Sequence, residues 1–190
     1  MRIVAGRFGG RRLPAAVPSA SRPTSDRVRE ALFSALQSRN AIEDAYVLDL
    51  FAGTGALGLE ALSRGARCLL SIDRDSKAVS AMRQNATALG VSQEMQILRA
   101  DLEKISVDAI MAAARHQSPM DLVLLDPPYA SVSLAMKFLE AHARGPLLHQ
   151  ESLIVLEHGA DEDPPMPSHL QQVGQYRYGD TTIVLMAPIA

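Results

Sequence analysis

The sequence predicts a three-layer α/β fold around a mostly parallel, seven-stranded sheet, and three observations support this prediction. Short strand-like runs alternate with segments of helical periodicity, which is the order of strands joined by crossover helices. The first five of these runs are almost entirely apolar, as expected for strands covered on both faces. Two further runs surround Gly179-Asp180 near the C-terminus and predict an antiparallel hairpin at one edge of the sheet.

The N-terminal part of the chain differs in character from the rest. Residues 1–25 are rich in Gly, Pro, Ser and Arg, and they are expected to form a basic, extended arm with a short hairpin at Gly9-Gly10. Residues 26–190 are expected to form the main domain. Its first helix begins near Asp26, where Thr24 or Ser25 can serve as the N-cap.

The remaining elements follow from apolar runs and from residues that start or stop helices. Ser76 is suited to cap one helix, while Gly65 and Gly90 are suited to end two of them. The expected strands are residues 46–51, 68–72, 95–98, 122–125, 153–156, 173–178 and 181–187. The expected helices begin near Asp26, Leu57, Ser76, Glu103 and Ser131 or Ser133, and end near Leu36, Arg64, Leu89, Arg115 and Ala143.

Composition narrows the class of protein. The 190 residues suit one domain, and the 47% apolar content is enough for a sizeable core. No apolar run reaches the roughly 18 residues that a membrane span requires, and the N-terminus lacks the features of a secretory signal. Cys68 is the only cysteine, and the five histidines are scattered, so we expect no disulfide and no metal site. A cytoplasmic protein fits these features.

Charge is distributed unevenly along the chain. Residues 1–29 contain seven arginines and one acidic residue, Asp26, whereas the remaining residues carry a net charge of −8. A basic arm on an acidic body suggests a polyanionic partner, although a solubilising tail would look the same. Because all seven are arginine, which binds phosphate with two parallel hydrogen bonds, a nucleic acid is favoured.

Acidic residues follow the first four expected strands. Asp49, Asp73, Asp101 and Asp126 each end a strand or follow it closely, and ligands of parallel sheets bind beyond these strand ends. The glycine-rich turn 53–58 matches the pattern of dinucleotide-binding proteins, so a nicotinamide-dependent oxidoreductase is one alternative. Asp49 would repel a pyrophosphate at that turn. It would attract the ammonium group of S-adenosylmethionine, which carries no phosphate.

Asp126-Pro127-Pro128-Tyr129 predicts chemistry on an amino group. Two prolines after a strand stop it and fix the backbone. Such a loop can accept both N–H bonds of an exocyclic amine, one by Asp126 and one by the Pro127 carbonyl. The nitrogen lone pair is then directed at a methyl donor. Tyr129 can stack on the base, which must be extruded from any duplex or stacked loop.

These motifs resemble those of known methyltransferases. The acid before Gly53-Thr54-Gly55 resembles the first motif of the class I methyltransferases, which have a three-layer, Rossmann-like fold. Asp126-Pro127-Pro128-Tyr129 resembles the Asn/Asp-Pro-Pro-Tyr/Phe motif of amino-methyltransferases acting on DNA and RNA. The order and spacing of segments 22–30, 48–66 and 126–129 are similar to those of the bacterial 16S rRNA guanine-N2 methyltransferase family of the small subunit.

The resemblance implies a role for each candidate residue. It implies S-adenosylmethionine as the methyl donor and 16S rRNA in the small ribosomal subunit as the partner, with no metal. The implied catalytic residues are Asp126, Pro127, Pro128 and Tyr129. Those for the cofactor are Asp49, Phe51, Ala52, Gly53, Thr54, Gly55, Asp73, Arg74, Asp101, Leu102 and Thr24. Those for the substrate are Arg7, Arg11, Arg12, Arg22, Arg27 and Tyr129.

Several alternatives stay open at this point. Asp126 would suit guanine N2, adenine N6 or cytosine N4 equally, and only the resemblance favours guanine in rRNA. Asp101 is as well suited to cap a helix as to accept a hydrogen bond from adenine. His158 and Glu157 follow the fifth strand, and either could face the pocket. A non-catalytic RNA-binding module with the same fold is a further alternative.

Overall fold

A computed structural model describes residues 1–15, 25–114 and 118–189, and it confirms the expected fold class. The strands form one sheet in the order β3-β2-β1-β4-β5-β7-β6. All pairings among the first five strands are parallel, whereas β7 runs antiparallel to both β5 and β6. The strands are β1 (Tyr46–Leu50), β2 (Cys68–Asp73), β3 (Met95–Arg99), β4 (Met120–Leu125), β5 (Leu148–Gly159), β6 (Leu170–Tyr178) and β7 (Thr181–Pro188).

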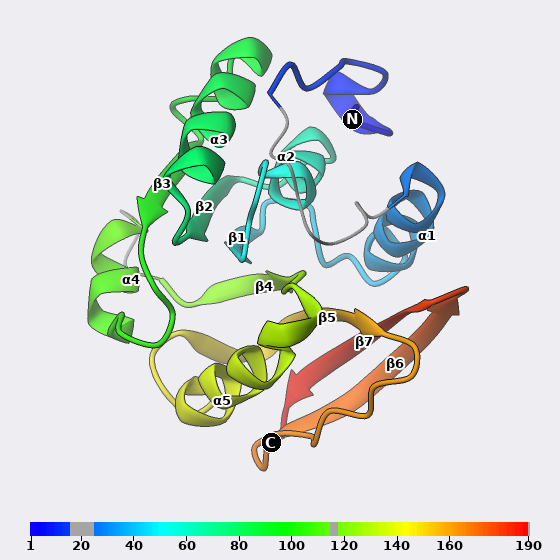
Figure 1. The fold of residues 1–190 in the computed structure, drawn as a ribbon, viewed down its shortest axis with the longest axis vertical. Helices are drawn as coiled ribbons and strands as arrows, with labels where there is room; N and C mark the ends of the chain where they lie inside the picture. The colour runs from blue at the N-terminus through cyan, green and yellow to red at the C-terminus, as the bar shows by residue number, and fades with distance from the viewer. Residues whose placement is uncertain (16–24, 115–117, 190) are drawn as a thin grey trace.

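Helices cover both faces of this sheet (Figure 1). α1, α2, α3 and the N-terminal arm lie on one face, and α4 and α5 lie on the other. The strand order reverses between β1 and β4, which is the point where parallel sheets of this kind bind ligands. The helices are α1 (Asp26–Gln37), α2 (Ala56–Ser63), α3 (Ser76–Leu89), α4 (Val107–Ala113) and α5 (Val132–His142), with short 3-10 helices η1 (Gly6–Phe8) and η2 (Tyr129–Ser131).

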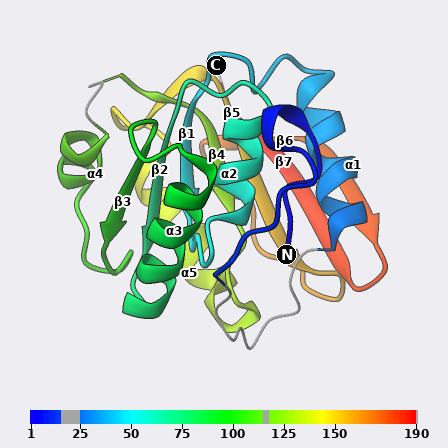
Figure 2. The same cartoon turned by 90° about the horizontal axis from the view of Figure 1, so that it is seen from above.

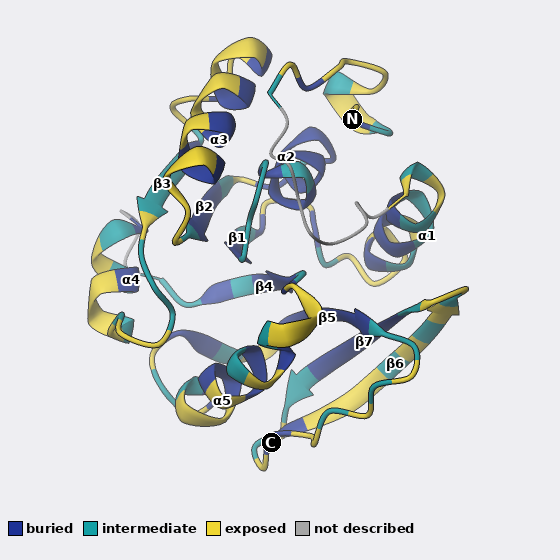
Figure 3. Cartoon of the chain, in the orientation of Figure 1, coloured by how far each residue is buried: buried dark blue, intermediate teal, exposed yellow. Residues whose placement is uncertain are grey.

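Alternating strand residues supply two separate cores. Val47 of β1 and Leu69 of β2 pack with α1, α2 and α3, whereas Leu48 and Leu70 pack with α4 and α5. Both faces of the central strands are therefore apolar, which explains their continuous apolar runs. Figure 3 shows these strands buried, while the edge strand β6 is largely exposed.

Several expected boundaries differ from the structure, β6 among them, and specific contacts explain the differences in three elements. α3 is capped by Asp75, which accepts a hydrogen bond from the Lys77 amide, so Ser76 is the first residue inside the helix. α4 begins at Val107 after the N-cap Ser106, because the preceding residues form turns that are closed by hydrogen bonds to Asp101. β5 extends well beyond 153–156 on both sides, because it pairs with β7 as well as with β4.

The described part of the arm is a folded hairpin. The Ile3 amide donates to the Arg11 carbonyl and the Leu13 amide donates to the Met1 carbonyl, so the predicted hairpin near Gly9-Gly10 is confirmed. Ile3 and Leu13 are buried in the core shared with α1 and α2. The hairpin lies against α2, between α3 and α1 (Figure 2). It is therefore packed against the main domain, whereas the sequence suggested an extended arm.

Candidate functional site

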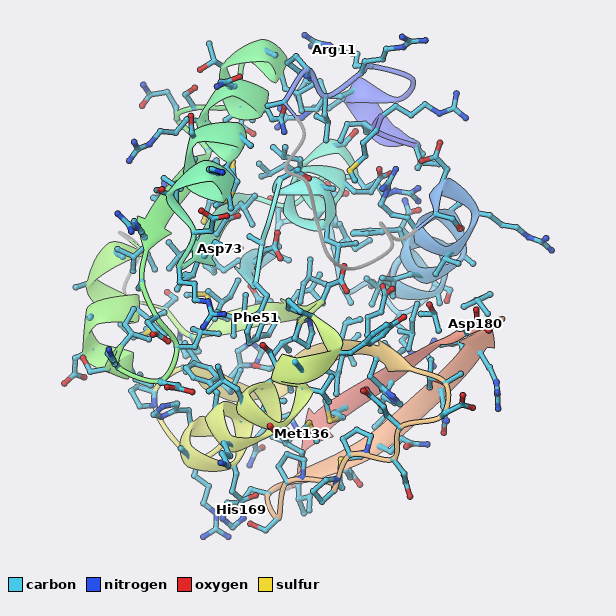
Figure 4. All side chains as sticks on the ribbon, in the orientation of Figure 1. Arg11, Phe51, Asp73, Met136, His169 and Asp180 are labelled. Carbon is cyan, nitrogen blue, oxygen red and sulfur yellow. The ribbon has the colours of Figure 1, made fainter. Side chains whose placement is uncertain are left out.

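Three of the four predicted strand-end acids gather at the middle of the sheet. Asp49 lies near the end of β1, Asp73 ends β2, and Asp126 follows β4, and these strands are neighbours. The three carboxyl groups are close enough that the charges of Asp126 and Asp73 add to the burial that raises the pKa of Asp49. Figure 4 shows Phe51 and Asp73 in this region, far from Arg11 in the arm. The rim therefore gathers three carboxyl groups where the strand order reverses.

Asp49 is the buried acid of this group. Its side chain is only 1% exposed, and Oδ2 accepts a hydrogen bond of 3.1 Å from the Gly58 amide. Burial raises the pKa of Asp49 to about 8, and the charges of Asp126 and Asp73 add to this shift, whereas the bond from Gly58 opposes it. A carboxylate held in this way favours a positively charged ligand, because such a ligand would offset the cost of ionisation.

Gly58 is a residue that the site prediction omitted. A Cβ there would come within 2.7 Å of the Leu69 side chain and 2.9 Å of Asp49 Oδ2. Glycine is therefore required for α2 to pack closely on β2 and to donate its amide to Asp49. The sequence did contain a signal for it, the third glycine of the turn 53–58.

The loop between β1 and α2 is tightly turned. Phe51, Gly53 and Gly55 all have left-handed backbone conformations, with φ of 59°, 55° and 77°. Phe51 is the notable one, because a bulky residue at positive φ is strained and such strain concentrates at binding sites. The Gly53 amide donates to Asp73 Oδ2 at 2.9 Å, and the Ala52 amide donates to the Ile72 carbonyl. Asp73 thus fixes the loop, while the Asp75 amide binds its other oxygen.

Asn85 links this loop to the arm, and sequence reasoning missed it. The residue is fully buried in α3. Its Nδ2 donates to the Thr54 carbonyl at 3.0 Å and to the Ala15 carbonyl at 3.2 Å, and its Oδ1 accepts from the Ala15 amide. Thr54 Oγ1 also lies 3.6 Å from the sulfur of Met1. An asparagine within a helical pattern carries no sequence feature that would reveal such a role.

The residues after β2 and β3 occupy the outer part of the rim. Asp101 is half-buried and its Oδ1 accepts from the Glu103 amide, so it caps a turn, while Ser106 caps α4. Leu102 is half-buried and packs against the core on the α4 side. Arg74 is exposed, and its carbonyl accepts from Arg99 Nε.

The loop Asp126-Pro127-Pro128-Tyr129 crosses the end of β4. Pro127 is buried, whereas the Tyr129 side chain is 52% exposed in η2. The Pro128 carbonyl accepts from the Ser131 amide at 2.6 Å, and no described residue donates to the Pro127 carbonyl. The Tyr129 ring lies beside Gly159 at the end of β5. The loop therefore places a carboxyl group, a carbonyl that receives no hydrogen bond from the described residues, and an accessible ring close together in the chain.

Glu157 and His158 face opposite sides of the sheet. Glu157 is paired with Ile183 and is two residues from Val155, and both belong to the core on the α2 side. His158 alternates with it and shares its side with Leu156 and Val184, which belong to the core on the α5 side. Of the two candidates, Glu157 faces the side on which Asp49 meets α2.

The arginines of the arm and α1 divide into two groups. Arg7 forms an ion pair with Glu94, and Arg11 donates to the Ala88 and Leu89 carbonyls at the end of α3. Arg12 and Arg27 are exposed, and no described residue bonds to their guanidinium groups. Arg22 and Thr24 lie outside the described residues.

The described ranges contain neither a metal-binding cluster nor a membrane-spanning helix. No group of three or more His, Cys, Asp or Glu side chains in them is placed to hold a metal ion. No helix in the same ranges is both long and apolar enough to cross a membrane.

Comparisons with known proteins identify the family. A family model described as Conserved hypothetical protein 95 matches residues 1–187. The chain is 33% identical over 186 residues to "Putative rRNA methyltransferase YlbH" of Bacillus subtilis, covering 97% of each chain. It is 33% identical over 166 residues to "Ribosomal RNA small subunit methyltransferase D" of Haemophilus influenzae, covering 87% of this chain and 81% of that one.

Solved structures agree with these relatives. "Putative methyltransferase yhhF" from Escherichia coli superposes with a TM-score of 0.77 at 30% identity, covering 99% of this chain and 97% of that one. The resemblance to small-subunit rRNA methyltransferases is therefore confirmed, as is the class I fold. The chain belongs to the Conserved hypothetical protein 95 family and is a methyltransferase with the class I fold.

Proposed function

We propose that this enzyme transfers a methyl group from S-adenosylmethionine to the exocyclic N2 of a guanine in 16S rRNA, within a small subunit or an assembly particle. The observation that carries the proposal is the loop Asp126-Pro127-Pro128-Tyr129, which lies beside the acidic rim at the switch point of the sheet. The name of the Haemophilus influenzae relative, which specifies small-subunit ribosomal RNA, supports the choice of substrate. The family favours methyl transfer over the nicotinamide alternative.

The acidic rim suits S-adenosylmethionine, which supplies an electrophilic methyl group on a positively charged sulfur. Its ammonium and sulfonium charges match the rim formed by Asp49, Asp73 and Asp126, where burial, with a smaller contribution from the charges of Asp126 and Asp73, raises the pKa of Asp49. Asp73 retains acceptor capacity for ribose hydroxyls beyond its bonds from Gly53 and Asp75. The narrow turn with Gly53 and Gly55 brings the backbone close to the ligand.

The chain's own residues would prepare the amine for attack. Asp126 and the Pro127 carbonyl each accept one N–H bond of the amine, which turns its lone pair out of the ring system. S-adenosylmethionine, when bound, would supply the methyl group as its carbon–sulfur bond breaks, and the amine nitrogen held by Asp126 and Pro127 would accept that group. One proton of the amine passes to Asp126 and then to water. Tyr129 stacks on the extruded base, a contact worth about 1–3 kcal/mol.

Product analysis tests this proposal. Purified enzyme is incubated with methyl-labelled S-adenosylmethionine and, separately, with free 16S rRNA, small subunits and DNA. The products are then digested to nucleosides. We expect label in N2-methylguanosine from rRNA, whereas label in N6-methyladenosine, or only in DNA, would reject the assignment.

Asp126→Ala separates catalysis from binding. We expect kcat to fall by about 10²–10⁴-fold, the usual range for a positioned proton acceptor. Binding of S-adenosylmethionine, measured by calorimetry, should weaken much less than kcat falls, because Asp49, Asp73 and the glycine turn are unchanged. Full methylation by this variant would exclude the proposed role of the loop and would favour a non-catalytic function of the fold.

A further inference from the structure

Glu157 is a buried acid beside the proposed catalytic loop that the mechanism above does not use. It is only 9% exposed and lies near the end of β5. β4 and β5 are parallel, and their last registered pair is Leu125 with Leu156. Asp126 directly follows the end of β4, and Glu157 is the next residue of β5. Because neighbouring strands lie about 4.8 Å apart, the two acids start from adjacent backbone positions.

The two acids also share a side of the sheet. Glu157 faces the α2 side, as its partner Ile183 and its neighbour Val155 show. The charge of Asp126 contributes to the raised pKa of Asp49. Asp49 in turn accepts a hydrogen bond from Gly58 of α2 on that same side of the sheet. The Tyr129 ring lies against Gly159, two residues beyond Glu157. A base held by Asp126 and stacked on Tyr129 would therefore present its edge toward the end of β5.

We propose that Glu157 reads the N1–H of the target guanine, and so selects guanine over other bases that carry an exocyclic amine. This inference rests on the proposed function. On the edge of guanine, N1–H and the N2 amine are neighbouring donors, so two adjacent carboxylates complement them. Adenine has an unprotonated N1 beside its amine, and cytosine an unprotonated N3. In either base a lone pair would face the carboxylate of Glu157, which disfavours entry.

The two carboxylates thus have different roles in this proposal. Asp126 handles the amine that becomes methylated, whereas Glu157 contacts a ring nitrogen that does not react. Glu157 is therefore a specificity residue, and its replacement should alter the choice of base more than the binding of the methyl donor. A hydrogen-bonded base edge of this kind usually provides about 5- to 150-fold discrimination, which corresponds to about 1–3 kcal/mol.

Base analogues make the proposal testable. 2-Aminopurine has the same 2-amino group as guanine but an unprotonated N1. Once the methylated position is mapped, small subunits are assembled from 16S rRNA with guanine or 2-aminopurine at that position. We expect wild-type enzyme to prefer guanine by at least about 10-fold in kcat/KM. Glu157→Gln, whose amide can donate to N1 of 2-aminopurine, should reduce this preference about 10- to 100-fold.

2-Aminopurine also lacks O6, and this loss affects both enzymes. Comparing the guanine preference of the variant with that of the wild-type enzyme therefore cancels its effect. Glu157→Asp retains a carboxylate and should keep the guanine preference despite a lower rate. Glu162→Gln removes a nearby acid, one that bonds to the Gly159 amide, and should leave the preference unchanged. Binding of S-adenosylmethionine and the thermal midpoint, measured for every variant, show that the fold and the cofactor site persist.

The outcomes separate the two proposals. An unchanged guanine preference in Glu157→Gln, with N2-methylguanosine still the product, overturns the role of Glu157 and leaves the proposed function standing. If Glu157→Gln fails to fold, loss of the guanine preference in Glu157→Asp overturns the inference. A wild-type product other than N2-methylguanosine overturns both.

Discussion

At the scale of single residues, Asp49 shows a conflict between stability and ligand binding. Burial raises its pKa from 3.8 to about 8, so the folded protein holds a proton there that the unfolded chain releases above pH 4. The contribution of Asp49 to stability is therefore greatest below about pH 4 and is lost as pH rises through about 8. A buried acid with this cost is retained at a site where a cationic ligand would bind.

Asp49→Asn should stabilise the protein in alkaline solution. The amide oxygen can still accept from the Gly58 amide, while the cost of ionising a buried group disappears. Since one pKa unit corresponds to about 1.4 kcal/mol, we expect the free energy of unfolding to increase by more than about 1 kcal/mol at pH 8 and to change little at pH 4. Urea unfolding at both pH values measures it.

Exposed Asp108 in α4 provides the matched control. Asp108→Asn should change the free energy of unfolding by less than about 1 kcal/mol at either pH. A pH-independent effect of Asp49→Asn would contradict the assigned protonation. The same variant should bind S-adenosylmethionine more weakly.

At the scale of elements, the arm hairpin is held to α2 by a buried charge cluster around Glu60. Glu60 is fully buried and accepts from the amides of Val4 and Ala5 at 2.7 and 3.0 Å. Arg64 Nε donates to it at 2.8 Å, and Arg29 Nε lies 3.5 Å away. Arg29 also donates to the Arg2 carbonyl, so α1, α2 and the arm meet at one carboxylate.

Glu60→Gln should therefore destabilise the protein strongly. The change leaves the charges of Arg29 and Arg64 buried with less compensation, which typically costs about 3–5 kcal/mol. Glu94→Gln removes only the partly exposed pair with Arg7 and should cost less than about 1 kcal/mol. Equal losses of unfolding free energy in the two variants would show that the buried cluster does not hold the hairpin.

For the whole molecule, the sequence predicted the layers and the rim better than it predicted the contacts between distant segments. Apolar runs located the strands because burial on both faces leaves a continuous pattern, and the strand-end acids Asp49 and Asp73 follow from parallel topology. The docking of the arm could not be predicted, because the sequence around Glu60 does not indicate that its carboxylate accepts hydrogen bonds from the arm. Asn85 was missed for the same reason: its partners, Thr54 and Ala15, are distant in sequence.

The placement of charge over the whole molecule leads to a prediction about RNA binding. Arg12 and Arg27 are exposed on the layer of the arm and α1, whereas Arg7 and Arg11 are engaged with the protein itself. We therefore expect Arg12 and Arg27 to contact phosphates of the rRNA. Changing both to Gln should weaken RNA binding. It should also reduce the slope of log Kd against log salt concentration by about 1 for each residue.

The opposite layer provides the comparison for this variant. Lys137 and Arg144 are also exposed, in and just after α5, so changing both to Gln removes the same charge from the other face of the sheet. Filter binding of 16S rRNA over a range of salt concentrations measures both slopes. Equal loss in the two double variants would mean that net charge alone attracts the RNA. A loss confined to Arg12→Gln and Arg27→Gln, with unchanged binding of S-adenosylmethionine, identifies the arm and α1 as the surface that receives the rRNA.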